Sequence, residues 1–484
     1  MKLYITNEKK TLETPAGANL LEVLRAAGFG PDAPCGGNGT CGKCKVLVNG
    51  SEQLACKTVI EEDMAVTLPE SGKAEILAKG ITAQVQAEGK DRYALAFDLG
   101  TTTVVAYLMD GATGEVLSRC SCMNPQTRYG GDVISRIQYA MDGGADELAE
   151  TIRKALAELT EQAAKLAGIC AKEITMVSLV GNTAMHHLLL GIDPKPLTVP
   201  PYMPSVSHAL EQKAAEFLPV AETAVLRVLP NIAGFVGADT VGCLAATRFD
   251  EREELTLLID IGTNGEMVLG NKDGFLACST AAGPAFEGAR ISCGMRGAEG
   301  AVDHVRLEGG ALSYTVIGGG EAQGLCGSGL LDLVAVLLQM EEISESGRMD
   351  ADFVLPGSTA ALTRKDVREV QLAKAAIRAG IELMCQKRGV ETENIRKVYL
   401  AGAFGSFMDP ASACAIGMIP PCLLDRIESI GNAAGEGAKL CALSSEAFEY
   451  SKRLAEKAEF LELASMEDFN DCYVDCLLFE EEDD

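Results

Sequence analysis

Four cysteines near the start of the chain constrain its fold more than any other feature of the sequence. Cys35, Cys41, Cys44 and Cys56 have the spacing C-x5-C-x2-C-x11-C, and glycine fills four positions between the first and the third of them. Four thiolates satisfy two irons, and a loop around such a core needs backbone conformations that glycine adopts without strain. The pattern therefore predicts a [2Fe–2S] cluster. Zinc and buried free thiols remain alternatives, although structural zinc usually uses two short cysteine pairs with a longer spacer.

The segments around these cysteines have the order of a small α+β domain. Residues 2–5 alternate like an edge strand, residues 19–27 have helical spacing, and residues 45–48 predict a strand that leaves the cluster loop. Strand, hairpin, helix, cluster loop and strand is the order of the ferredoxin β-grasp, which residues 1–67 resemble. The first gap is similar to that of vertebrate-type ferredoxins rather than to the plant-type C-x4-C-x2-C.

A connector follows this domain. Residues 68–92 separate it from a run of buried-strand character that begins at Tyr93. The connector is not rich in Gly and Ser, so we expect part of it to pack. A length of 484 residues favours two or three domains in all.

The second part of the chain repeats a short motif. A strand that ends in Asp98 is followed by Gly100, Thr101, Thr102 and Thr103, and about 160 residues later the arrangement recurs. The second copy consists of Asp260, Gly262, Thr263 and Asn264. Such turns present N–H and O–H donors to phosphate groups, and the Asp can hold Mg²⁺ through water.

Each copy is followed by a strand, a Gly turn and a helix, at residues 178–183 and at residues 399–405, which contain Gly402 and Gly405. A further Gly-rich loop with Gly327 and Gly329 precedes an apolar helix. This internal duplication resembles the actin/hexokinase/Hsp70-type (ribonuclease H-like) ATPase fold. Two unrelated α/β domains are the alternative.

Three more motifs make the resemblance specific. They are Asn124–Ile137 (NPQTRYGGDVISRI), Gly181–Met185 (GNTAM), and Phe286–Gly288 (FEG) followed by Ser292–Met295 (SCGM). With an iron–sulfur domain joined to an actin-like ATPase, the chain resembles the reductive activators of corrinoid enzymes. The resemblance implies an α/β multidomain protein with a ferredoxin domain (1–67), a linker (68–92), a first ATPase half (93–255), and a second half with a C-terminal extension (256–484).

The resemblance also implies a function. Such a protein takes an electron from a low-potential donor, hydrolyses ATP, and reduces an inactive Co(II) corrinoid to Co(I) on a corrinoid protein or methyltransferase. Plant-type [2Fe–2S] clusters lie near about −400 mV and Co(I) corrinoids lie lower, so ATP must supply a conformational bias.

Site residues carry over by motif. The cluster ligands are Cys35, Cys41, Cys44 and Cys56, and both Asp-x-Gly-Thr loops bind the ATP phosphates with Mg²⁺. Gly402 and Gly405 match the adenosine motif, with Gly327 and Gly329 on a hinge-type or nucleotide-adjacent turn. Asp260 and Asp239 are candidate bases for hydrolysis. Ser292 is a candidate oxygen ligand for the corrinoid cobalt. For His186 and His187, packing is favoured over function.

Composition excludes some partners. The chain has 42 Lys and Arg against 69 Asp and Glu, a formal net charge of −27, which argues against nucleic acid. No run of 18 apolar residues and no signal peptide is recognised, so we expect a cytoplasmic protein without a membrane span. A homodimer is expected by analogy with activators of this fold.

Two rival functions remain. The first is an ATP-coupled electron donor to another metalloenzyme such as a dehydratase. The second is a redox-sensing regulatory protein that uses ATP binding as a switch.

Overall fold

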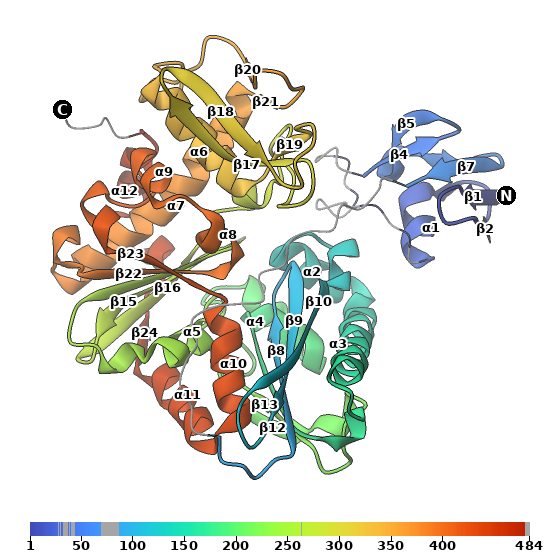
Figure 1. Cartoon of the computed structure of the whole chain (residues 1–484), viewed down its shortest axis with the longest axis vertical. Coiled ribbons are helices and arrows are strands. Elements are labelled where there is room, and N and C mark those ends of the chain that lie inside the picture. The colour runs from blue at the N-terminus through green and yellow to red at the C-terminus, as the bar shows by residue number, and fades with distance from the viewer. Residues whose placement is uncertain are drawn as a thin grey trace.

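The computed structural model of the protein describes residues 1–27, 29, 31, 37, 39, 44–68, 87–262 and 264–479. The predicted site residues Cys35, Cys41 and Thr263 lie outside these residues. Figure 1 shows a small N-terminal module in blue beside two larger α/β halves. Within the described part, no helix is long and apolar enough to cross a bilayer.

The N-terminal module is a five-stranded sheet covered by one helix. Its elements are β1 (Lys2–Ile5), β2 (Lys10–Glu13), β3 (Ala18–Asn19), α1 (Leu20–Ala26), β4 (Lys45–Val48), β5 (Ser51–Leu54), β6 (Val59–Ile60) and β7 (Met64–Thr67). The sheet has the order β2-β1-β7-β4-β5, with β1 and β7 parallel. The β-grasp prediction is confirmed. The prediction of an edge strand at residues 2–5 is wrong, because β2 and β7 pair with β1 on both sides.

The alternation of that first strand has a simple cause. Leu3 and Ile5 point into the core, where they meet Leu20, Leu21 and Leu24 from one face of α1. The helix begins at Asn19, whose side chain accepts the N–H groups of Leu21 and Glu22.

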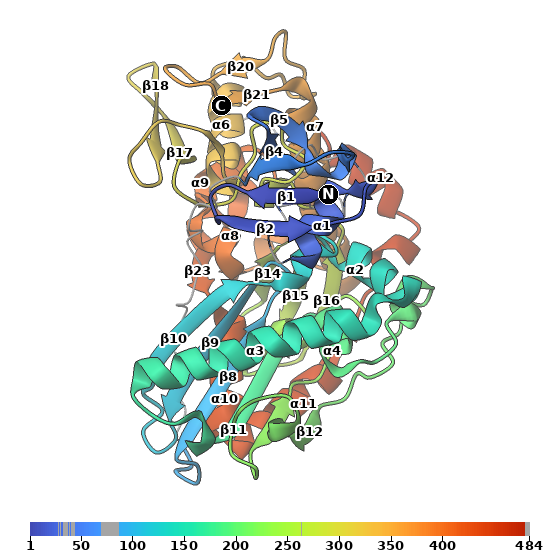
Figure 2. The ribbon, with the colours of Figure 1, turned by 90° about the vertical axis from the view of Figure 1, so that its right-hand side faces the viewer.

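The first ATPase half is built on a six-stranded sheet. It contains β8 (Tyr93–Leu99), β9 (Thr103–Asp110), β10 (Val116–Met123), β11 (Ile174–Gly181), β12 (Leu210–Lys213), β13 (Val225–Val228), α2 (Val133–Tyr139), α3 (Ala145–Ala167), α4 (Thr183–Leu190) and α5 (Ala238–Thr247). The order is β10-β9-β8-β11-β13-β12. Figure 2 shows α3 lying across the strands of this sheet, where its apolar stripe joins the core.

The second half repeats this plan. It contains β14 (Thr256–Ile261), β15 (Gly265–Asn271), β16 (Gly274–Thr280), β22 (Lys397–Ala401), β23 (Ile427–Gly431), β24 (Ala458–Phe460), α7 (Arg364–Arg388), α8 (Gly402–Phe407), α9 (Pro410–Ala415), α10 (Ala433–Leu443), α11 (Ser445–Lys457) and α12 (Phe469–Asp475). The order β23-β22-β14-β15-β16-β24 has the same antiparallel hairpins followed by parallel strands. The predicted duplicated, actin-like fold is confirmed.

An insertion enlarges the second half. It holds β17 (Ala301–Glu308), β18 (Ala311–Val316), β19 (Gly324–Leu325), α6 (Gly327–Gln339), β20 (Phe353–Val354) and β21 (Ala361–Leu362). These elements lie at the top of Figure 1, above the sheet of the same half.

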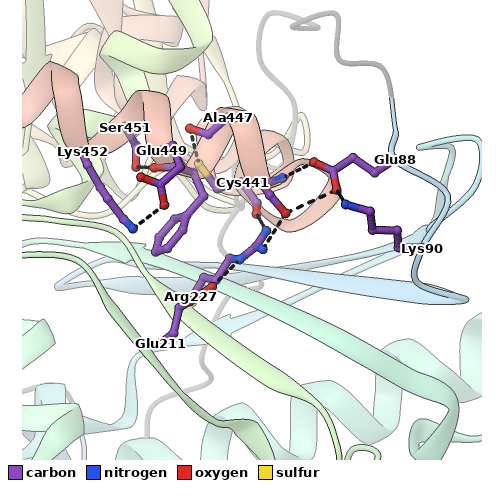
Figure 3. A network of polar contacts seen from close by, with 11 residues as sticks. Glu88, Lys90, Glu211, Arg227, Cys441, Ala447, Glu449, Ser451 and Lys452 are labelled. Carbon is purple, nitrogen blue, oxygen red and sulfur yellow. Dashed lines mark hydrogen bonds and ion pairs between the residues drawn. The ribbon is translucent and has the colours of Figure 1, made fainter.

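The halves meet along α5 and α10. Gly242 and Gly437 allow this close approach, because a Cβ on Gly437 would lie 2.2 Å from the carbonyl oxygen of Gly242. The end of the expected connector is fixed nearby. Ser445 donates its backbone N–H to Glu88 (2.6 Å) and accepts a hydrogen bond from Arg227 at its hydroxyl (2.9 Å). Figure 3 shows Arg227 donating to the carbonyl of Cys441 (3.0 Å). The chain thus enters the ATPase body beside the α10–α11 corner.

Candidate functional site

Two of the four predicted cluster cysteines lie together. Cys44 precedes β4 and is 1% exposed, and Cys56 lies in the turn Ala55–Lys57. The backbone N–H of Cys56 points at Cys44 Sγ (3.5 Å), and Asn19, the residue that caps α1, donates to the carbonyl of Cys56 (2.9 Å). An N–H directed at sulfur is the environment that an iron–sulfur thiolate requires.

The described part of the cluster loop fits the same purpose. Gly37 and Gly39 have φ angles of +99° and +74°, which glycine adopts without strain. Gly37 also lies close to the fourth cysteine, because a Cβ there would be 3.9 Å from Cys56 Cβ. Among the described residues, no three or more His, Cys, Asp or Glu side chains are placed so that they could hold a metal ion. The other two predicted ligands, Cys35 and Cys41, lie outside the described residues.

The predicted first phosphate loop is held by residues of the sequence motifs. Gly100 donates its N–H to the carbonyl of Thr103 (2.9 Å), and Asn124 donates to the carbonyl of Gly100 (2.8 Å). Arg136 donates to the carbonyl of Thr101 (2.5 Å), and Asn182 donates to the hydroxyl of Thr101 (2.8 Å). The sequence singled out the motifs that contain Asn124, Arg136 and Asn182, but it did not predict that these side chains hydrogen-bond to the loop at residues 100–101.

The second loop lies against the adenosine motif. Gly262 donates its N–H to the carbonyl of Asn264 (2.9 Å). Gly402 begins α8 with φ +81°, and a Cβ there would lie 2.4 Å from Asp260 Oδ1. Only glycine fits this position without displacing the carboxylate. Gly405 lies inside α8, against Leu400.

Three predicted carboxylates, Asp98, Asp239 and Asp260, lie close enough together that the charge of one raises the pKa of another. Burial raises the pKa of Asp98 to about 6, against a hydrogen bond from Asn432 (2.7 Å) that lowers it. Burial and the charge of Asp260 raise the pKa of Asp239 to about 7, and burial and the charge of Asp98 raise the pKa of Asp260 to about 7. The structure therefore brings the first-loop and second-loop acids together, as a duplicated nucleotide cleft requires.

A fourth carboxylate was missed by sequence reasoning. Glu266 on β15 is the cross-strand partner of Asp260 on β14, so both side chains lie on one face of the sheet. Burial, then the charges of Asp239 and Asp260, raise its pKa well above the ordinary value. The tight hairpin at residues 261–265 was the available signal, since it places residues 260 and 266 opposite each other.

A cavity of about 210 Å³ opens between the two halves. Thr102 and Thr103 line it from the first half, and Gly327 and the stacked rings of Phe286 and Phe404 line it from the second (centroids 4.8 Å apart, planes at 12°). Gly329 does not line it; a Cβ there would lie 2.2 Å from the Val302 carbonyl oxygen, so this glycine serves packing.

Hydrogen bonds between the two halves cross the cleft at this cavity: Arg296 donates to Met123 Sδ (3.9 Å), and a second bond involves Thr102. The hydroxyl of Thr102 donates to Glu287 Oε2 (2.9 Å). Glu287 ends the short turn Ala285–Glu287, next to Gly288. The first phosphate loop is therefore joined directly to the segment that carries the FEG and SCGM motifs.

Comparison with known proteins decides the family. Family models match residues 3–67 (2Fe-2S iron-sulfur cluster binding domain), 93–252 (RACo middle region) and 254–484 (C-terminal domain of RACo, the ASKHA domain). The corrinoid activation enzyme RamQ of Eubacterium limosum is 37% identical over 416 residues, which cover 80% of this chain and 70% of that protein. This chain belongs to the family of corrinoid reductive activators.

Two further relatives agree. The [Co(II) methylated amine-specific corrinoid protein] reductase of Methanosarcina barkeri is 27% identical over 79% of this chain and 76% of its own length. A solved structure, the reductive activator for corrinoid, iron-sulfur protein, is 28% identical with a TM-score of 0.73 and covers 99% of this chain and 98% of its own.

In this corrinoid activator, Ser292 lies outside the cavity lining. It is exposed, its N–H donates to Asp366 Oδ1 (2.7 Å), and its hydroxyl donates to the same oxygen (3.1 Å). Asp366 also completes the capping box of Thr363 at the start of α7. Because the Ser292 hydroxyl donates its hydrogen to Asp366, the lone pairs of its oxygen stay available to another partner.

The two histidines on α4 are packed, as favoured. His187 Nδ1 meets the carbonyl of Thr183 (2.7 Å), and its Nε2 accepts the N–H of Ser205 (3.1 Å). Asn231 donates to His186 Nδ1 (2.6 Å). These contacts join α4 to the following loop and place neither ring in the cavity.

We expect His186 to make this activator sensitive to acid. Burial, with the nearby His187, lowers its pKa from 6.5 to about 4. Between pH 6.5 and about 4, this histidine is therefore protonated in the unfolded chain but neutral in the folded protein. The free energy of unfolding decreases as the pH falls through this range. The loss between pH 7.5 and pH 5 amounts to about 2 kcal/mol. Urea unfolding of His186→Asn should show a smaller loss than the wild type, and an equal loss would contradict this expectation.

Proposed function

We propose that this protein is an ATP-dependent reductive activator that passes an electron from its [2Fe–2S] cluster to an inactive Co(II) corrinoid on a corrinoid protein or methyltransferase. The observation that carries the proposal is likeness over nearly the whole chain to a solved reductive activator, with both the cysteine module and the duplicated cleft present. The cluster supplies one-electron chemistry at low potential.

The cleft residues have separate roles in this proposal. The N–H and O–H groups of both loops bind the ATP phosphates, and Asp98 or Asp260 holds Mg²⁺ through water. Asp239 and Asp260 are the candidates to accept a proton from the attacking water, since a pKa near 7 suits a base at neutral pH. The proposed phosphate-binding residues are Asp98, Gly100, Thr101, Thr102, Thr103, Asp260, Gly262, Thr263 and Asn264. Gly327, Gly402 and Gly405 flank the adenosine.

The contact between Thr102 and Glu287 offers a route from nucleotide to corrinoid. Phosphate groups bound at Thr102 would repel the Glu287 carboxylate. They would also accept the hydrogen bond that the Thr102 hydroxyl now donates to Glu287. Loss of this contact would weaken the link between the first loop and the segment that leads to Ser292. A nucleotide can bias a conformation only through such differential contacts.

Ser292 is proposed to offer its oxygen to the cobalt face of the corrinoid. Its exposure supports this role, and its bond to Asp366 orients the loop. The test is Ser292→Ala. Unchanged corrinoid reduction with intact ATPase would rule the role out. A low-potential electron donor and a homodimer complete the proposal.

The deciding experiment is anaerobic. Reduced protein, MgATP and a Co(II) corrinoid protein are mixed, and the cobalt spectrum is followed. We expect Co(I), or methylated product when a methyl donor is present, only when ATP is included. Absence of both, with the cluster intact, would refute the proposal. ATP hydrolysis that responds to cluster oxidation state without electron turnover would favour a redox sensor, and reduction of a dehydratase instead would favour the other rival.

A further inference from the structure

The N-terminal module is far less acidic than the chain that carries it. Residues 1–67 contain seven Lys and Arg and eight Asp and Glu, whereas the whole chain contains 42 and 69. Nearly all of the net charge of −27 therefore belongs to the rest of the molecule. An acidic protein that approaches this molecule is repelled almost everywhere else.

The strand register separates the charges within the module. Because β1 and β7 are parallel and β4 is antiparallel to β7, the end of β1 and the start of β4 share one end of the sheet. Lys10 faces Ile5 at the end of β1, and Lys45 begins β4 directly after Cys44. This end, which we call the cluster end, carries the cysteine site.

Four exposed lysines gather at the cluster end: Lys9, Lys10, Lys45 and Lys57. Lys57 follows Cys56 and extends over the cluster loop, since a Cβ on Gly39 would lie 2.5 Å from its Cε. Among the described residues, the acids near this end include Glu8, Glu52 and Glu22, the last in the first turn of α1, whose N-cap Asn19 bonds Cys56. The pair of Lys45 with Glu52 (2.9 Å) leaves both side chains more than half exposed (58% and 59%), so it is screened by water.

The opposite end of the sheet is acidic. Glu13 faces Lys2 at the start of β1, and Glu61, Glu62 and Asp63 precede β7. Lys2 donates its backbone N–H to Asp63 (2.7 Å), which fixes this acidic segment beside the chain start. The module is therefore an electric dipole whose positive end holds the cysteines.

We infer that the cluster end, with its lysines Lys9, Lys10, Lys45 and Lys57, is the docking face for an electron-donor protein with an acidic surface. Repulsion by the body and attraction at this end orient such a donor toward the cysteines. In the step itself the reduced donor loses one electron and the [2Fe–2S] centre gains it, with no proton transfer. The inference rests on the proposed role of the cluster as electron acceptor, and it adds the chemistry of the donor.

The test measures cluster reduction in the full-length protein by stopped flow, without ATP or corrinoid. The donor is a small acidic [4Fe–4S] ferredoxin, reduced beforehand. We expect the second-order rate constant to fall about tenfold or more between about 20 mM and 500 mM salt, since steering is screened within about 3–10 Å at high salt. Lys9→Glu and Lys57→Glu should each slow reduction several-fold at low salt and weaken the salt dependence.

Lys2→Glu is the matched control, because it makes the same charge change at the acidic end and should leave the rate near that of the wild type. A dye titration of each variant separates a changed cluster potential from changed docking. Equal rates for Lys57→Glu and Lys2→Glu at matched potential would overturn the inference. A rate that rises with salt would also overturn it. Such a result would indicate that the lysines of the cluster end bind the acidic body of this same chain, and that salt releases them. Since neither ATP nor corrinoid takes part, failure of ATP-driven corrinoid reduction would be a separate result.

Discussion

Replacing Cys44 with alanine is expected to abolish corrinoid reduction while leaving nucleotide binding and ATP hydrolysis close to wild type. Cys44 is buried in the core of the N-terminal module, and its sulfur accepts the N–H of Cys56. Alanine removes this sulfur, which is both a predicted iron ligand and the acceptor of that hydrogen bond. The proposed nucleotide cleft is built from residues of the two later halves, such as Thr102, Asp260 and Glu287, and not from the N-terminal module that holds Cys44. Iron content, the visible spectrum and the cobalt spectrum during turnover measure the result.

Cys120→Ala is the matched control for this variant. Cys120 is also buried (4% against 1% for Cys44), but it lies in the core of the first ATPase half. The same truncation there should cost about 1 kcal/mol of stability and leave cluster and electron transfer intact. A Cys44→Ala protein that retains two irons and reduces corrinoid at the wild-type rate would contradict the assignment of this cysteine.

Motifs that are short in sequence allowed most of the site to be predicted. Asp98 and Asp260 each precede a Gly turn at the end of a buried strand, and this local pattern is enough to locate a phosphate loop. The ferredoxin order of segments is likewise local. Both features follow from neighbouring residues. The fold confirms the ferredoxin order of segments, whereas the phosphate-binding role of the two loops stays a prediction.

Contacts between distant segments could not be predicted in the same way. Thr102 and Glu287 are 185 residues apart, and Asn432 and Asp98 are 334 apart. In neither pair does the sequence around one residue indicate which distant residue it contacts. The hydrogen bond from Ser292 to Asp366 is another such contact, and it fixes the direction of the serine hydroxyl.

The edge-strand error has a related cause. Alternation in residues 2–5 reports that one face of the strand is buried. It does not report how many neighbours hydrogen-bond to the strand, because both edge and central strands of a one-sided sheet alternate. The position of β1 follows from pairing with β7, some 60 residues later.

Replacing Asp260 with asparagine is expected to stop ATP hydrolysis and at the same time to stabilise the nucleotide-free protein. The folded pKa of Asp260 is about 7, against an ordinary value of 3.8. The folded state therefore keeps a proton that the unfolded chain releases, and stability is lost as pH rises from about 4 to about 7. At pH 8 the whole penalty applies, and asparagine, which does not ionise, escapes it.

The expected gain at pH 8 is about 2 to 4 kcal/mol, and it should shrink by more than half at pH 5. Urea unfolding at both pH values, together with phosphate release, measures the two effects. Asp250→Asn is a control of opposite sign: burial opposes ionisation there, but bonds from Lys457 and Tyr450 outweigh it and lower the pKa, so this variant should lose stability. An Asp260→Asn protein that is less stable than wild type at pH 8, or that hydrolyses ATP normally, would show that the carboxylate is structural. If Asp260→Asn gains stability and loses ATP hydrolysis, the buried carboxylate lowers the stability of the fold but is needed for the reaction.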